Sequence, residues 1–275
     1  GEDRAKPLTF WIMVLAYPLA GALPVWILPL RLSDIWVAVQ PVILMAAGFA
    51  AGLFVARRLK LGPGTAGVFA YTAALSNIGF TLGGFICLRL YGEQGLAYSL
   101  VYILLWTVVF YGVFFPLAGR FAGLAVRYTA ATFFRNLVDL RCLPLVGSLA
   151  GIALNLAGVP RPDLVDRLHL VDALLIVCTA VMFFVTGLRL HVSHLFENTR
   201  LFLWLAGIKF ILFPAMAVGL LALVRAMGMP ISELAVDVMI VESTMPAALF
   251  GVMVANLYDL DAPLASALFV GNTVM

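Results

Sequence analysis

The chain has 275 residues, of which 64% are hydrophobic and 11% are charged, and its net charge is +3. Soluble globular domains are nearer half apolar and a quarter charged, so this composition excludes an ordinary soluble protein. A mean hydropathy of +1.08, spread over long apolar segments, predicts an all-α polytopic membrane protein, because a membrane β-barrel would show short alternating segments instead.

Nine apolar segments are predicted to be membrane helices, since a helix needs about 20 apolar residues to span a bilayer. In chain order they cover residues 8–30, 35–57, 65–90, 96–118, 142–160, 170–190, 201–224, 231–258 and 262–275. The last segment is short. No zinc-binding His-Glu-x-x-His motif, serine elbow or phosphate loop accompanies these segments, so we expect neither an enzyme nor a nucleotide-driven pump.

The loops between the segments divide their basic residues unequally. One side of the membrane receives eleven lysines and arginines and the other side receives five. The positive-inside rule therefore places residue 1 and the 119–141 connection in the cytoplasm and the C-terminus outside, in a plasma (inner) membrane. Because these charges lie in short loops, they indicate orientation and not nucleic-acid binding.

The third and eighth segments are unusually long and share a pattern. Tyr91 follows Ser76 by 15 residues, and Tyr258 follows Ser243 by the same 15 residues. A short acidic turn comes after each tyrosine, as "YGEQG" and as "YDLDAP". The two patterns are offset by 167 residues, which predicts an internal repeat.

The same offset aligns most of the remaining segments. Segment 35–57 falls on the seventh segment, and only 142–160 lacks a partner, which would lie before residue 1. We therefore expect two inverted five-helix repeats, of which the first repeat lacks its first helix. Inverted repeats are typical of secondary transporters. Residues 1–118 would form the first repeat, 119–141 the connection and 142–275 the second repeat.

Both long segments carry polar and helix-weakening residues at mid-membrane depth, in "SNIGFTLGGF" and in "ESTMPAALFG". Gly79, Gly83 and Gly84 permit unusual backbone torsions, and Pro246 lacks an amide donor. Each segment is therefore predicted to be two half-helices joined by unwound backbone. Such backbone is tolerated in a membrane only where it is buried or lines a cavity.

Glu242 is a charged residue inside one of these breaks, and an intramembrane ionisable residue is a functional hypothesis by default. We expect Glu242 to bind a cation or a proton, with Ser76, Asn77, Ser243 and Thr244 as oxygen donors. A sodium ion held by Asn77 and Glu242 is one form of this site, with no other cofactor expected. The alternatives are that the hydroxyls bond to their own helices and that Asn77 bridges two helices.

The backbone at Gly79 and Pro246 completes the predicted site. Lys209 is the other charge inside a segment, and three interpretations remain open for it. It attracts an anionic substrate, it is a tethered cation paired with Glu242 or Asp237, or it extends toward the cytoplasmic headgroups along its own stem.

The residues around the breaks resemble one known family. "SNIGF" is similar to the Asn-x-Gly-Phe crossover of the auxin efflux carrier family, and "MPAALFGVMVANLYDLDAPLAS" is similar to that family's second crossover. "LPLVGSLAGIALNLAGVPRP" resembles the helix that opens its second half. Together these stretches extend the resemblance over most of the chain.

The resemblance implies a ten-helix fold of two inverted repeats, each with a crossed, broken fourth helix. It implies transport of small organic anions, such as auxin in plants or malate- and malonate-like acids in bacteria. The expected mechanism is an elevator motion within a homodimer in the lipid bilayer, with a carboxylate at the half-helix N-termini.

Two positions depart from the family pattern. Gly84 stands where the family usually has a proline, and Glu242 is more similar to a residue of the related bile-acid/sodium symporters. The second departure implies sodium or proton coupling. The alternative from another class is a non-transporting membrane sensor or binding protein built on the same fold.

Overall fold

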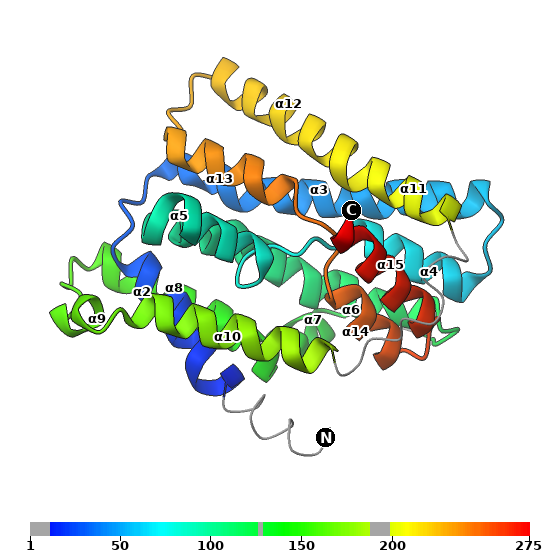
Figure 1. Ribbon diagram of the computed structural model, residues 1–275, viewed down its shortest axis with the longest axis horizontal. Helices are drawn as coiled ribbons and strands as arrows, with labels where there is room; N and C mark the ends of the chain where they lie inside the picture. Colours follow the sequence, from blue (N-terminus) through cyan, green and yellow to red (C-terminus); the bar gives the residue numbers. More distant parts are fainter. Residues whose placement is uncertain (1–11, 126–128, 188–198) are drawn as a thin grey trace.

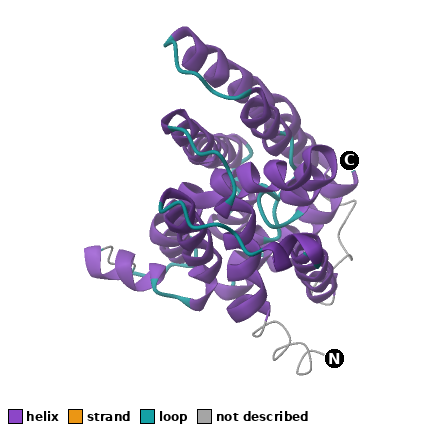
Figure 2. Cartoon of the chain, turned by 90° about the vertical axis from the view of Figure 1, so that its left-hand side faces the viewer, coloured by secondary structure: helices purple, strands orange, loops and turns teal. Residues whose placement is uncertain are grey.

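The computed structural model describes residues 12–125, 129–187 and 199–275 (Figure 1). These residues form helices and loops only, apart from one isolated antiparallel bridge (Figure 2). The first half contains the π-helical turn η1 (Ile12–Ala16), α2 (Tyr17–Trp26), η2 (Leu32–Asp34), α3 (Ile35–Arg58), α4 (Pro63–Ala74) and α5 (Leu82–Val109), which continues through η3 (Phe110–Phe114), α6 (Phe115–Leu117) and η4 (Ala118–Arg120).

The second half is also helical. It contains α7 (Ala130–Leu137), η5 (Leu140–Cys142), α8 (Leu143–Leu156), α9 (Asp163–Arg167), α10 (Leu170–Gly187), α11 (Thr199–Gly207), the π-helical turn η6 (Ile208–Leu212), α12 (Phe213–Ala226), α13 (Glu233–Ser243), α14 (Phe250–Leu257) and α15 (Ala262–Val274). Within the described residues each predicted segment is largely helical, but segments 65–90 and 96–118 share α5, which continues through a kink at Gly92. The predicted ends 8–11 and 188–190 lie outside the described residues. The short helices α7 and α9, in connections between segments, were not predicted.

The helices are apolar enough to lie in a membrane, as the composition predicted. Three continuous helices in the described residues are long enough to cross it, over Leu32–Arg58, Leu82–Arg120 and Thr199–Ala226. Shorter apolar helices cover Val14–Trp26, Leu143–Leu156, Leu170–Val181 and Ala262–Val274. The protein is therefore an all-α polytopic membrane protein, and the inverted repeat stays a prediction.

Two groups of helices meet along α5. In the first, which we call the α2–α8–α10 group, α2 packs along α8 and also contacts α10. The second, the crossover group, contains α3, α4 and α11 to α15. Small residues allow the close packing of α2 on α8: a side chain at Gly147 would collide with the backbone of Pro18, and one at Gly151 with that of Ala22.

Buried polar contacts fix the end of the α2–α8–α10 group to α5. The guanidinium of Arg161, which follows α8, forms ion pairs with Glu93 and Asp166 and donates to the carbonyl oxygen of Leu23 at 3.0 Å. Its side chain is only 5% exposed. A buried guanidinium needs such partners, so this contact holds α5 against α2 in the conformation described.

The backbone takes a positive φ after each long broken segment. Gly92, which follows Tyr91, has a φ of 67° and kinks α5, and Asp259, which follows Tyr258, has a φ of 51°. Left-handed backbone is uncommon outside glycine, asparagine and aspartate, so the glycine and the aspartate suit these positions. The two turns lie at equivalent positions of the pattern seen in the sequence.

Candidate functional site at the crossover

Both long segments break where the sequence predicted. In the first, α4 ends at Ala74 and α5 begins at Leu82. In the second, α13 ends at Ser243 and α14 begins at Phe250. The residues between are not helical, so each segment consists of two half-helices joined by unwound backbone.

The two unwound stretches cross and hydrogen-bond to each other as an antiparallel pair. The amide of Asn77 donates to the carbonyl oxygen of Pro246 at 2.8 Å, and the amide of Ala248 donates to that of Leu75 at 2.9 Å. These bonds satisfy backbone groups that could find no water inside a membrane. Asn77 therefore bridges the two crossing stretches through its main chain.

The three glycines of the first break have two different roles. Only Gly79 takes a left-handed torsion, with a φ of 67°. Gly83 and Gly84 lie within α5 and are needed for close approach, which corrects the expectation of unusual torsions at all three. A side chain on Gly84 would collide with the carbonyl oxygen of Gly79, and one on Gly83 with the carboxylate of Glu242.

Glu242 is buried at the beginning of α5, with only 1% of its surface exposed. The amide of Gly79 lies 3.4 Å from each carboxylate oxygen, and the hydroxyl of Ser99 donates to Oε1. A carboxylate beside a helix N-terminus is favoured by the helix dipole. Glu242, from the last turn of α13 just before the second break, thus occupies the anion position of the first break.

The hydroxyls predicted beside Glu242 bond to their own helix. Ser243 Oγ donates to the carbonyl oxygen of Ile240 at 2.7 Å, and Thr244 Oγ1 donates to that of Val241 at 2.7 Å. This is the alternative role considered for them. The described residues contain no group of three histidine, cysteine or acidic side chains that could hold a metal, and a sodium ion at Asn77 and Glu242 stays a prediction.

Lys209 is fully buried in η6, and its ammonium reaches the first break. Nζ donates to the carbonyl oxygen of Leu75 at 2.9 Å and to Ser76 Oγ at 2.9 Å. It also lies 4.6 Å from the centre of the Phe213 ring. Oxygen atoms and an aromatic face are all favourable neighbours for a cation.

Two expectations for Lys209 were wrong. Its side chain does not extend toward the headgroups, because it is 0% exposed and points to the crossover. Within the described residues it forms no ion pair with Glu242 or Asp237. The carboxylate of Glu242 is bonded to Ser99 and Gly79, and Asp237 is exposed.

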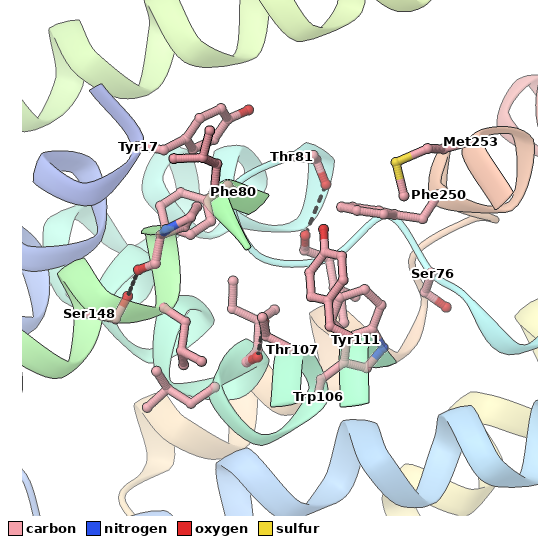
Figure 3. A pocket seen from close by; sticks show the side chains of 16 residues that line it. Tyr17, Ser76, Phe80, Thr81, Trp106, Thr107, Tyr111, Ser148, Phe250 and Met253 are labelled. Carbon is pink, nitrogen blue, oxygen red and sulfur yellow. Dashed lines mark hydrogen bonds between the residues drawn. The ribbon is translucent and has the colours of Figure 1, made fainter. Parts of the chain in front are cut away.

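A cavity of about 150 Å³ lies between the α2–α8–α10 group, α5 and the crossover (Figure 3). Its lining is mostly apolar and aromatic, and no charged side chain lines it in the described part of the chain. The aromatic lining residues are Tyr17, Phe80, Trp106, Tyr111 and Phe250, and the aliphatic hydroxyls are those of Ser76, Thr81, Thr107 and Ser148.

Most of the aliphatic hydroxyls point their hydrogen at nearby backbone (Figure 3). Thr81 donates to the carbonyl oxygen of Ile78, Thr107 to that of Ile103, and Ser148 to that of Pro144. These three hydroxyl groups therefore present oxygen lone pairs to the cavity and not hydrogen-bond donors. A bound anion would need donors from elsewhere.

Two sources of free donors lie at the cavity. The indole N–H of Trp106 donates no hydrogen bond within the described residues, and its ring stacks on Phe110 at 5.0 Å. Phe250, the first residue of α14, also lines the cavity. The amides of Leu249 and Phe250 donate no hydrogen bond to other described residues, as is usual at a helix N-terminus.

Sequence reasoning missed Ser99, Trp106 and the cavity itself. Ser99 and Trp106 are ordinary residues of an apolar segment, and no motif distinguishes them. The available signal was weak: the two residues lie seven positions apart, on one face of one helix.

The comparisons with known proteins agree on one class. A family model described as membrane transport protein matches residues 30–275. A protein of Methanothermobacter thermautotrophicus, described as an uncharacterized transporter, is 26% identical over 239 residues. The alignment covers 86% of this chain and 74% of that protein.

Proposed function

The chain belongs to the auxin efflux carrier family of membrane transport proteins, and from that premise we propose that it carries small monocarboxylates with an apolar or aromatic body. The family makes it a transporter and not an enzyme. The proposal narrows the substrate beyond the small organic anions that the resemblance implies. It places the transporter in the plasma (inner) membrane, with residue 1 on the cytoplasmic side.

The uncharged lining of the 150 Å³ cavity carries this proposal. A single carboxylate would bind at the N-terminus of α14 and accept from the indole N–H of Trp106, while the apolar body packs on Tyr17, Phe80 and Phe250. A second carboxylate would find no cationic side chain among the described lining residues. Burying an unpaired charge costs several kcal/mol, which disfavours dicarboxylates.

The position of the cavity supports an elevator mechanism. Pro144 and Ser148 come from the α2–α8–α10 group, whereas Ile78 and Phe250 come from the crossing stretches. The hydrogen bonds between those stretches make them one unit, so they would move together past the α2–α8–α10 group. We propose that this movement carries the substrate across the bilayer, within a homodimer of inverted repeats.

Thermal unfolding of the purified protein tests the substrate class. Phenylacetate and hexanoate, at constant ionic strength and pH, should raise the midpoint in a concentration-dependent way, because a ligand of the folded state stabilises it by mass action. Malonate and succinate serve as matched dicarboxylate probes and should have no effect. A larger rise with the dicarboxylates would contradict the proposal.

Trp106→Phe is expected to weaken binding of phenylacetate by roughly 10-fold or more. The substitution keeps the stack on Phe110 but removes the indole donor, and a hydrogen bond to a charged group contributes about 1.5–3 kcal/mol. Isothermal titration gives the dissociation constant. The control is Trp204→Phe, at an exposed position on α11, which should bind as the unchanged protein does. Equal affinity in both variants would remove Trp106 from the site.

A further inference from the structure

The first crossover contains a buried lysine, Lys209, that forms no ion pair with an acidic side chain of the described residues. Lys209 Nζ contacts the carbonyl oxygen of Leu75, the hydroxyl of Ser76 and the face of Phe213, and its side chain is fully buried. Burying an unpaired charge is unfavourable, and these three contacts offset part of that cost for an ammonium. The position of those contacts, at the end of α4, indicates a role for the lysine.

Leu75 directly follows Ala74, the last residue of α4. The carbonyl groups at the end of a half-helix carry partial negative charge, and transporters with broken helices bind their coupling cations at such ends. We propose that Lys209 is a built-in cation: its ammonium occupies the end of α4 that a transported cation would otherwise occupy. The carrier then needs no inorganic cation at the first crossover.

The local structure of the helix supports this role. Lys209 lies in the π-helical turn η6, between α11 and α12. A π-helical turn inserts one extra residue, which rotates the following residues about the helix axis, and such turns are frequent at functional sites. The turn allows a lysine to face the crossover from a helix that is otherwise apolar.

The opposite end of the same break has the opposite charge. The carboxylate of Glu242 lies beside Gly79, three residues before α5 begins. The lysine therefore meets the end of α4 and the carboxylate meets the approach to α5. Each tethered charge has the sign that its helix end favours. The broken helix is thereby neutralised by side chains of the protein itself.

The space between the two charges offers few side-chain oxygen ligands for a sodium ion. A cavity of about 10 Å³, room for about one water, is lined by Ser76 and Phe213, which contact Lys209, and by Glu242. Among its described lining residues, side-chain oxygen comes only from Ser76, Tyr102 and Glu242. Ser76 already accepts from Lys209, and a hard cation such as calcium takes six or more oxygen ligands.

Thermal unfolding without any substrate tests the built-in cation. The unchanged protein should unfold at the same temperature in sodium chloride as in choline chloride at equal ionic strength. Lys209→Met, which fills the space without a charge, should lower the midpoint by about 5 °C or more, because the Leu75 carbonyl and Ser76 lose a charged donor. Lys209→Arg, which retains a positive charge, should lower the unfolding midpoint by less.

Chemical rescue gives the sharper readout. Lys209→Ala leaves an empty channel beside the end of α4, so ethylammonium chloride should raise its unfolding temperature above the value in choline. The same salt should not affect Lys209→Met, whose side chain fills the channel. If Lys209→Ala does not fold, the sodium comparison and Lys209→Met still decide the question.

Three results would overturn the inference. These are a sodium-specific rise in the unchanged protein, a Lys209→Met protein as stable as the unchanged one, or no ethylammonium effect on a folded Lys209→Ala. The consequence for transport rests on the proposed function: uptake should be equally fast in choline and in sodium. The stability results need no substrate, so they remain informative if the substrate proposal fails.

Discussion

Replacing Glu242 with alanine is expected to abolish uptake, by roughly 100-fold or more, while leaving a folded protein. The carboxylate accepts hydrogen bonds from Ser99 and Gly79 and lies at the N-terminus of α5. Removing it leaves these buried donors unpaired, and each bond to a charged acceptor contributes about 1.5–3 kcal/mol. Uptake in proteoliposomes measures the effect, and fluorescence-detected size exclusion reports the folding.

Two variants separate the role of charge from that of shape. Glu242→Gln retains the size of the side chain and an acceptor for Ser99 but removes the negative charge. This variant should lose most of the uptake. Glu233→Ala removes an exposed carboxylate at the start of the same helix, where it pairs with Arg225 at 3.0 Å, and this variant should transport normally. Full activity of Glu242→Ala would rule out a role for this carboxylate in transport.

Gly84→Ala is expected to destabilise the protein and to abolish uptake, although it adds a single methyl group. That group would collide with the carbonyl oxygen of Gly79, which belongs to the backbone and cannot rotate away. Overpacking of this kind costs about 1–3 kcal/mol, and here it would displace Gly79, whose amide contacts Glu242. The unfolding temperature and the rate of uptake should therefore both fall.

The matched control is Gly219→Ala in α12, where nothing lies within 4 Å of the added atom. Alanine is a better helix former than glycine by about 0.5–1 kcal/mol, so this variant should be unchanged or slightly more stable. A Gly84→Ala protein that behaved like Gly219→Ala would show that the two breaks are not packed as closely as described.

The sequence predicted the helices and their breaks because both depend on local chemistry. A run of about 20 apolar residues specifies a membrane helix, and polar residues beside Gly79 or Pro246 weaken one. The order of the half-helices follows from those two signals. The crossing of the breaks also follows, because unwound backbone inside a membrane must find a hydrogen-bonding partner.

Partners from distant segments could not be predicted in this way. Ser99 bonds to Glu242 across many residues of sequence, and nothing in "LAYSLVYILLW" marks this serine. The direction of the Lys209 side chain stayed open because it depends on the π-helical turn η6, which no sequence pattern revealed. Gly83 and Gly84 were correctly associated with the break, but the reason is the packing of other residues against them and not their torsions.

The most direct test of the account is uptake of radiolabelled phenylacetate into proteoliposomes, with protein-free liposomes as the background. We predict saturable uptake that unlabelled hexanoate inhibits, that succinate leaves unchanged, and that Gly84→Ala loses. Thermal stabilisation by phenylacetate without uptake would instead identify a binding or sensing protein built on the transporter fold. Uptake of labelled succinate in place of phenylacetate would contradict the proposed substrate class.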